Sequence, residues 1–142
     1  MAITRKAAAH WEGSLMEGKG AVSFNSSELG QFPVTWAARS AEPNGVTSPE
    51  ELIAAAHSTC FSMALSHGLA QAGTPPETLD TAAEVDFKPG TGITEIRLSV
   101  VARVPGLTAA QFTEAANAAK EGCPVSQALK AVPITLTATL SE

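Results

Sequence analysis

Charged side chains are scarce in this sequence. They make up 16% of its 142 residues, against about 25% in an ordinary soluble domain, and this shortage suggests that extra surface is hidden in an oligomer. The net charge is −5, and the longest cluster of basic residues is Arg5-Lys6. Both features argue against nucleic acid as the main partner, because phosphate binding needs a basic face. The hydrophobic fraction of 44% excludes a disordered chain.

Long apolar segments are also missing. The first residues, MAITRKAAAHWEG, have no apolar run of signal-peptide length behind their basic residues. From Leu52 to Pro76 no residue carries a permanent charge, but histidine, serine and threonine make this stretch too polar for a membrane span. We therefore expect a soluble, cytoplasmic protein. In that reducing compartment the two cysteines, Cys60 and Cys123, are not expected to form a permanent structural disulfide.

The order of the expected elements predicts an α+β fold. The chain shows no internal repeat and no long linker, so we expect residues 1–142 to form one domain, or one half of an intertwined dimer. Turn residues and alternating patterns predict strands and helices rather than a parallel α/β sheet with a Gly-rich phosphate loop. The expected strands are 4–13, 20–26, 31–37, 81–87, 93–104 and 134–140, and the expected helices are 49–71, 107–122 and 123–130.

Two of the helices have clear start signals. The long helix begins with Ser48 as N-cap, Pro49 at the first helical position and Glu51 at the third. The next helix has Thr108 and Gln111 in the same capping-box relation. These capping residues predict the first residue of each helix more sharply than the helix propensities of the residues do.

Cys60 lies at the centre of the long helix, three turns from any helix end. Burial there raises the pKa of a thiol, so a reactive Cys60 needs a cation nearby, and an inert buried cysteine is the more common outcome. By its position before the helix, Arg39 is the best candidate for that cation. Glu50 is ten residues from Cys60, about 15 Å along a straight helix. If Glu50 assists Cys60, it comes from a second subunit.

Cys123 precedes Pro124 in the segment EGCPVSQ. If Pro124 opens a short helix, Cys123 is its N-cap, and the helix N-terminus favours a thiolate there. The alternative is that Gly-Cys-Pro is only a sharp corner of the chain.

His57 allows three interpretations. It lies one turn before Cys60, so a Cys–His dyad is conceivable, although such neighbours point sideways and no third orienting group is identifiable. A zinc site formed by His57, Cys60 and Cys123 lacks the usual ligand-pair spacing. We favour a residue of a small pocket or an interface, and we expect no metal site.

The segment SPEELIAAAHSTCFSMALSHG, followed later by CPVSQAL and a Thr-alternating last strand, resembles the OsmC/Ohr family of organic hydroperoxide reductases, and more closely its OsmC branch. The resemblance implies an intertwined homodimer with antiparallel sheets around a long, central, buried helix. It also implies that Cys60 is the peroxidatic thiol and Cys123 the resolving thiol. Glu50 matches the acid that pairs with an active-site arginine. For that arginine we choose Arg39 over the region of Arg5.

The family's chemistry then implies a two-cysteine peroxidase cycle. A Cys60 thiolate would attack a hydroperoxide, and Cys123 would resolve the sulfenic acid as a disulfide. An external dithiol or a lipoylated protein would reset the thiols, and no metal, haem or flavin would be needed. An apolar wall around Cys60 would favour alkyl hydroperoxides over hydrogen peroxide. The side chains expected to form this pocket are Trp36, Leu52, Ile53, His57, Phe61 and Met63.

A different class of function competes with this one. The same dimer would serve as a non-catalytic redox sensor or a binding protein for apolar ligands, because a fold does not fix a function. The two hypotheses differ on whether Cys60 and Cys123 can reach disulfide distance and on whether the protein turns over with a dithiol.

Overall fold

A computed structural model describes all 142 residues of the chain, which divides into two compact units, Met1–Leu52 and Ile53–Glu142. The long helix α2 (Pro49–Gln71) begins in the first unit and continues in the second. None of the helices combines the length and the apolar character that crossing a membrane requires.

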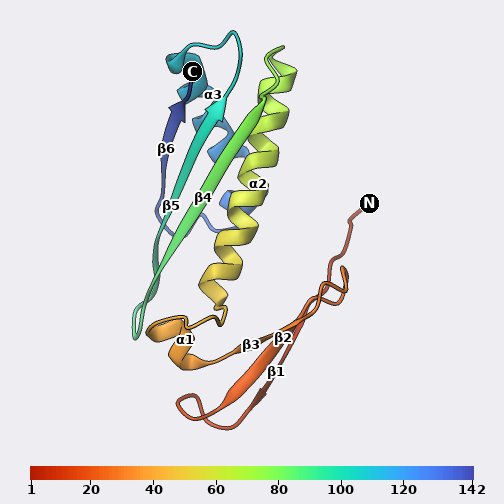
Figure 1. Cartoon of the computed structure of the whole chain (residues 1–142), viewed down its shortest axis with the longest axis vertical. Helices are drawn as coiled ribbons and strands as arrows, with labels where there is room; N and C mark the ends of the chain where they lie inside the picture. The colour runs from red at the N-terminus through yellow and green to blue at the C-terminus, as the bar shows by residue number, and fades with distance from the viewer. The chain divides into compact units, whose positions relative to one another are not determined.

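The first unit is a small antiparallel sheet followed by a short helix. Its strands β1 (Ala8–Glu12), β2 (Lys19–Ser23) and β3 (Gln31–Val34) pair in the order β1-β2-β3, and Figure 1 draws them in red and orange. Thr35 is the N-cap of the helix α1 (Trp36–Ser40), and its hydroxyl accepts from the Ala38 N–H. In this unit Ala38 and Glu50 are the buried residues, so the sheet has no apolar core of its own.

The second unit is a three-stranded sheet covered by helices. The strands β4 (Thr78–Lys88) and β5 (Gly92–Arg103) form an antiparallel hairpin, and β6 (Ile134–Leu140) pairs parallel to β5. The helices α3 (Ala109–Gly122) and α4 (Pro124–Ala128) connect β5 to β6. Figure 1 shows α2 running along this sheet.

The core of the second unit comes from one stripe of α2, one face of β5 and one face of α3. The alternation along β5 buries every second side chain against the helices, as period-2 patterning requires. These core residues are Phe61, Leu65, Leu69, Leu98, Val100, Ala102, Val104, Phe112, Ala116, Ala119 and Cys123. The sulfur of Cys123 is therefore part of the hydrophobic core.

The structure confirms the α+β class and most of the expected elements. The α2 helix starts at Pro49, with the Glu51 N–H donating to Ser48 Oγ at 3.2 Å, and the Thr108–Gln111 capping box is complete. The face of β5 that carries Ile96, Leu98 and Val100 is buried, as an alternating strand pattern requires.

Three details differ from expectation. Because β6 follows the α3–α4 crossover, it enters the sheet parallel to β5, so this sheet is mixed rather than antiparallel. The expected strand 31–37 ends at Val34, because Thr35 caps the helix α1. Finally, α2 is buried along one stripe in the single chain, and Met63 on the other side is 67% exposed.

Candidate active site

The helix α2 places Cys60 at the edge of the core of the second unit. Its neighbour Phe61 is fully buried, whereas Cys60 is half-buried and packs against the core from its margin. A thiol at such a position is shielded from most water but can still be reached from outside. Cys60 therefore has the partial exposure that a reactive cysteine needs.

Cys123 lies at the junction of two helices. Its N–H donates to the Ala119 carbonyl at 2.9 Å and closes α3, while its own carbonyl accepts from the Gln127 N–H at 3.0 Å. Pro124 is the first residue of α4, so Cys123 is the N-cap of that helix, as the sequence predicts. Backbone hydrogen bonds therefore fix the chain on both sides of Cys123, at the end of α3 and at the start of α4, and so position its sulfur.

The two thiols are neighbours in space although they are far apart in the sequence. Both are free, and the Cys60 S–H donates a hydrogen bond to the Cys123 sulfur. Disulfide formation requires the two sulfurs to approach each other, and this contact already brings them close. The chain thus brings together the two cysteines that the family resemblance paired.

The electrostatics of the two thiols differ. Burial raises the pKa of Cys60, and the neighbouring Cys123 raises it further, against one hydrogen bond from the Val125 N–H. Burial also raises the pKa of Cys123, but hydrogen bonds from the Ser126 N–H, the Cys60 thiol, the Ser126 hydroxyl and the Val125 N–H outweigh it and lower that pKa. In the single chain these contacts favour a thiolate at Cys123 and disfavour one at Cys60. A thiolate at Cys60 requires positive charge that these neighbours do not supply.

The first unit holds a separate charged pair. Arg39, in the last turn of α1, donates from Nη2 and Nε to Glu50 Oε1 at 2.9 and 3.0 Å. The carboxylate of Glu50 is nearly buried, with 8% of its side chain exposed, and the Arg39 side chain is 33% exposed. Two parallel donors fix the planes of both groups. Arg39 thus lies on the short helix α1, and it is the partner of Glu50.

His57 has a partner outside its own helix. Its Nε2 lies 2.7 Å from Ser126 Oγ, and both side chains are buried in the second unit. Burial lowers the pKa of His57, so the imidazole stays neutral near pH 7. With Nε2 engaged by Ser126, the observed contact is His–Ser rather than the Cys–His dyad considered above.

The remaining candidates fall into different environments. Phe61 is fully buried in the core and Met63 is exposed, while Trp36, Leu52 and Ile53 are half-buried. Arg5 is exposed, and its guanidinium donates to the Thr4 carbonyl. No three histidine, cysteine or acidic side chains gather in a way that would hold a metal ion.

Sequence reasoning missed Ser126 and the amide of Val125, which both bond to sulfur. The signal that could have found them is the helix start at Cys-Pro. The first N–H groups of any helix have no partner within it and point at the N-cap.

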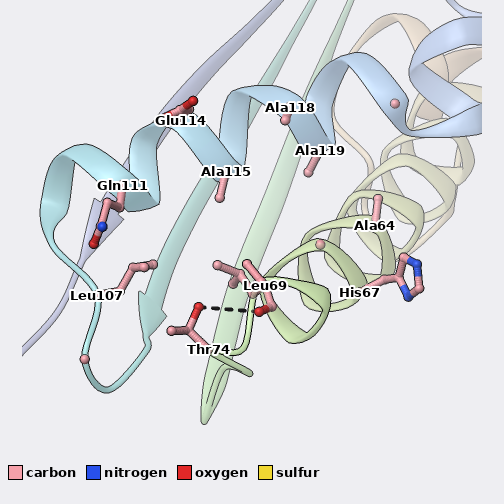
Figure 2. A pocket seen from close by; sticks show the side chains of 14 residues that line it. Ala64, His67, Leu69, Thr74, Leu107, Gln111, Glu114, Ala115, Ala118 and Ala119 are labelled. Atoms are coloured by element: carbon pink, nitrogen blue, oxygen red, sulfur yellow. Dashed lines mark hydrogen bonds between the residues drawn. The ribbon is translucent and has the colours of Figure 1, made fainter.

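An open groove of about 660 Å³ lies between α2 and α3 in the second unit. Figure 2 shows Ala64 on one wall and Ala115 and Ala119 on the other, with Leu107 toward one end. Ala64 is one turn after Cys60, and Ala119 bonds the Cys123 N–H, so the groove begins beside the two cysteines. Alanine, glycine and leucine form most of the lining of this groove, together with His67, Thr74, Gln111 and Glu114.

Comparison with known proteins places the chain in a family. The model of the OsmC-like protein family matches residues 42–137, which is more than half of the chain. Peroxiredoxin OsmC of Escherichia coli (strain K12) is 48% identical over 134 residues, covering 92% of this chain and 93% of the relative. Peroxiredoxin OsmC of Shigella flexneri matches equally well. The chain belongs to the OsmC-like protein family, and the expected family is confirmed.

Solved structures of the family share the fold. An OsmC-like protein from Mycoplasma pneumoniae superposes with a TM-score of 0.75 at 14% identity, over 100% of both chains. An organic hydroperoxide resistance protein OsmC from Legionella pneumophila gives 0.68 at 22% identity, over 99% of this chain and 100% of its own. At such identities the likeness establishes the architecture, and the chemistry has to be argued from the thiols.

Proposed function

We propose that this protein is a thiol-dependent peroxidase that reduces organic hydroperoxides to alcohols by a two-cysteine mechanism. The observation that carries the proposal is the hydrogen-bonded pair of free thiols, Cys60 and Cys123, in a relative of peroxiredoxin OsmC. Two reduced cysteines in contact, one partly exposed and one buried, provide an attacking group and a resolving group within one chain.

The first step assigns Cys60 as the nucleophile, because it is the thiol that substrate can reach. Its thiolate attacks the outer oxygen of ROOH and the O–O bond breaks. The sulfur keeps the OH as a sulfenic acid, and the alkoxide takes up a proton to leave as ROH. We expect Arg39, held by Glu50, to supply the positive charge that the Cys60 thiolate needs.

The second step assigns Cys123 as the resolving thiol. Its thiolate attacks the Cys60 sulfur, the S–O bond breaks, and hydroxide leaves to become water as the disulfide forms. The lowered pKa of Cys123, which results from the α4 amides and the Ser126 hydroxyl outweighing burial, supports this role. A dithiol, for example on a lipoylated protein, then returns two electrons and restores both thiols.

The groove between α2 and α3 supports an organic substrate. Most of its lining is alanine, glycine and leucine, which offer apolar contact to an alkyl group, and a molecule as small as hydrogen peroxide would gain little from them. The groove thus favours substrates of the form ROOH with an apolar R.

We further propose that the protein works as an intertwined homodimer. The sheet β1–β3 leaves Trp11 and Phe32 partly exposed and has no apolar core of its own. A three-stranded sheet without a core is not stable in water by itself. A second copy that covers this sheet and the exposed side of α2 would supply the missing burial. A reducing cytoplasm would keep both thiols ready between turnovers.

Mass spectrometry of the reduced protein after one equivalent of cumene hydroperoxide tests the proposal. We expect a rapid loss of two hydrogens, a peptide cross-link between Cys60 and Cys123, and full reversal by a dithiol. A protein that oxidises once but does not turn over with a dithiol would favour the redox-sensor function. Thiols that remain reduced would rule out the peroxidase. Because we expect no cofactor, treatment with a chelator should leave turnover unchanged.

A further inference from the structure

The contact between His57 and Ser126 lies beside the thiols, yet the two-cysteine cycle does not use it. Both side chains are buried, and His57 Nε2 lies 2.7 Å from Ser126 Oγ. The other ring nitrogen, Nδ1, is also buried and has no partner. Burying a polar group without a hydrogen bond costs free energy. A histidine that is only half satisfied in a core therefore calls for a reason.

The position of Ser126 links this contact to Cys123. Ser126 is the third residue of α4, the helix that Cys123 caps. Ser126 lies close enough to Cys123 for its N–H and its hydroxyl to stabilise a Cys123 thiolate and lower the pKa of that thiol. A hydroxyl has one hydrogen, so when that hydrogen points to the sulfur, the Ser126 oxygen can only accept from His57.

This direction also fits the state of the imidazole. Burial lowers the pKa of His57 and keeps the ring neutral near pH 7, so it carries a single hydrogen. If that hydrogen is on Nε2, the unpartnered Nδ1 is an acceptor lone pair rather than a stranded N–H. The same tautomer satisfies the contact with Ser126 and leaves the less costly group unpaired.

We propose that His57 and Ser126 form a positioning pair for Cys123, in which the His57 Nε2–H donates to the Ser126 hydroxyl and this hydroxyl donates to the Cys123 sulfur. The pair holds Cys123 as a thiolate aimed at Cys60. The inference rests on the proposed function, since it concerns the second step of that cycle. In this pair His57 acts through Ser126, to which its Nε2 is bonded.

Few other titratable groups face Cys123. Cys60 of α2 is the one that bonds to it. On α3, Lys120 and Glu121 precede it, 3.5 Å apart from each other, and Lys120 Nζ also donates to the Ile134 carbonyl. The strand β6, ITLTATL, has no titratable side chain. The pH profile of Cys123 is therefore expected to report chiefly on Cys60 and the His57–Ser126 pair.

The test measures the ionisation of Cys123 and the second chemical step separately. In a Cys60→Ser background Cys123 is the remaining thiol, and its ultraviolet thiolate absorbance can be titrated against pH. We expect Ser126→Ala to move this titration to higher pH. With both cysteines present, Ser126→Ala should slow disulfide formation roughly tenfold, the effect of losing one hydrogen bond to a charged group. Formation of the Cys60 sulfenic acid, trapped with dimedone, should keep its rate.

Conservative variants separate positioning from packing. Ser126→Thr keeps the hydroxyl and His57→Gln keeps an N–H donor, so both should retain most of the wild-type profile, whereas His57→Leu should shift it as Ser126→Ala does. Ser62→Ala is a matched control, because the Ser62 hydroxyl lies 2.6 Å from Thr81 Oγ1, outside the proposed site. We expect Ser62→Ala to leave the titration unchanged.

Two outcomes would overturn the pair. One is an unchanged Cys123 titration in Ser126→Ala, and the other is an equal shift in Ser126→Thr, which would mean that volume rather than the hydroxyl matters. If His57→Leu does not fold, the two Ser126 variants decide the matter alone. A wild-type protein that forms no disulfide would instead reject the proposed function, while the titration would still decide whether the pair exists.

Discussion

The two units of the chain differ in how much of their structure each can hold by itself. The second unit buries aromatic and aliphatic side chains from two helices and a sheet around Cys123. In the first unit the buried side chains are Ala38 and Glu50, and its strands remain largely open to solvent. The thiols thus lie in the unit with an apolar core, whereas the charged pair Arg39–Glu50 lies in the unit without one. This division suggests that the reactivity of the thiols depends on how the first unit assembles with a second copy of the chain.

The largest effect is expected at the thiols themselves. Cys60→Ser should abolish turnover, because an alcohol at this position does not ionise and does not react with peroxide. Cys123→Ser should permit one oxidation and then stall at the sulfenic acid or at over-oxidised forms. Peroxide consumption with a dithiol measures the first effect, and intact-protein mass measures the second.

Circular dichroism serves as the control, since serine nearly preserves the volume of cysteine in both variants. Residual steady-state activity in Cys60→Ser would reject Cys60 as the nucleophile. Normal cycling of Cys123→Ser would remove Cys123 from the mechanism.

A pair of phenylalanines compares the two cores directly. Phe112 of α3 is fully buried in the second unit, so Phe112→Ala should cost about 3–5 kcal/mol of unfolding free energy. Phe32 of β3 is 45% exposed in the single chain, and at an exposed site such a change is worth roughly 0.5 kcal/mol or less. Urea unfolding at two protein concentrations measures both.

The proposed dimer changes the expectation for Phe32. If a second copy covers β3, Phe32→Ala should weaken the dimer. The urea midpoint of the variant should then depend more strongly on protein concentration than the midpoint of the wild type. A midpoint that does not move with concentration in either protein would contradict the idea that the first unit is completed by a partner copy.

The next largest effect on stability is expected at the charged pair Arg39–Glu50. Arg39→Ala leaves the nearly buried Glu50 carboxylate without its partner. We expect a loss of about 1–3 kcal/mol, less than the roughly 3–5 kcal/mol of a fully buried pair because Arg39 is partly exposed. If Arg39 also stabilises the Cys60 thiolate, alkylation of Cys60 should move to higher pH. The double variant Arg39→Ala/Glu50→Gln separates the two effects, because it removes the unpaired charge but does not restore the cation.

The parts of this structure that follow from the sequence are local or periodic. The caps at Ser48 and Thr108 and the alternation of β5 need only neighbouring residues, so the pattern determines them. The parallel entry of β6 depends on how a crossover packs, and α1 is too short to leave a helical period. The contact of Ser126 with His57 could not be predicted from the sequence, because it requires the start of α4 to meet the middle of α2 in space.

A smaller effect on the free energy of unfolding should follow from a change of pH. Burial lowers the pKa of His57 below the value of about 6.5 that it has in the unfolded chain. The unfolded state therefore binds a proton first, and the free energy of unfolding should fall as pH drops below about 6.5. His57→Gln should remove this part of the pH dependence. His67→Gln, at an exposed position on the same helix, should keep it, and an equal loss in both variants would contradict the assignment to His57.

The smallest effect compares helix caps in the two units. Thr108 caps α3 in the second unit with a complete capping box, and Thr35 caps α1 in the first with one bond to the Ala38 N–H. Each substitution by alanine should cost about 1 kcal/mol if the helix is part of the cooperative structure. In a dimer that unfolds as one body, Thr35→Ala and Thr108→Ala lower the same transition by similar amounts. If the first unit opens by itself, Thr35→Ala leaves the main transition in place and instead speeds amide hydrogen exchange in α1, around Arg39. Exchange rates for α1 and α3 in both variants therefore decide whether the unit that carries the charged pair is held as firmly as the unit that carries the thiols.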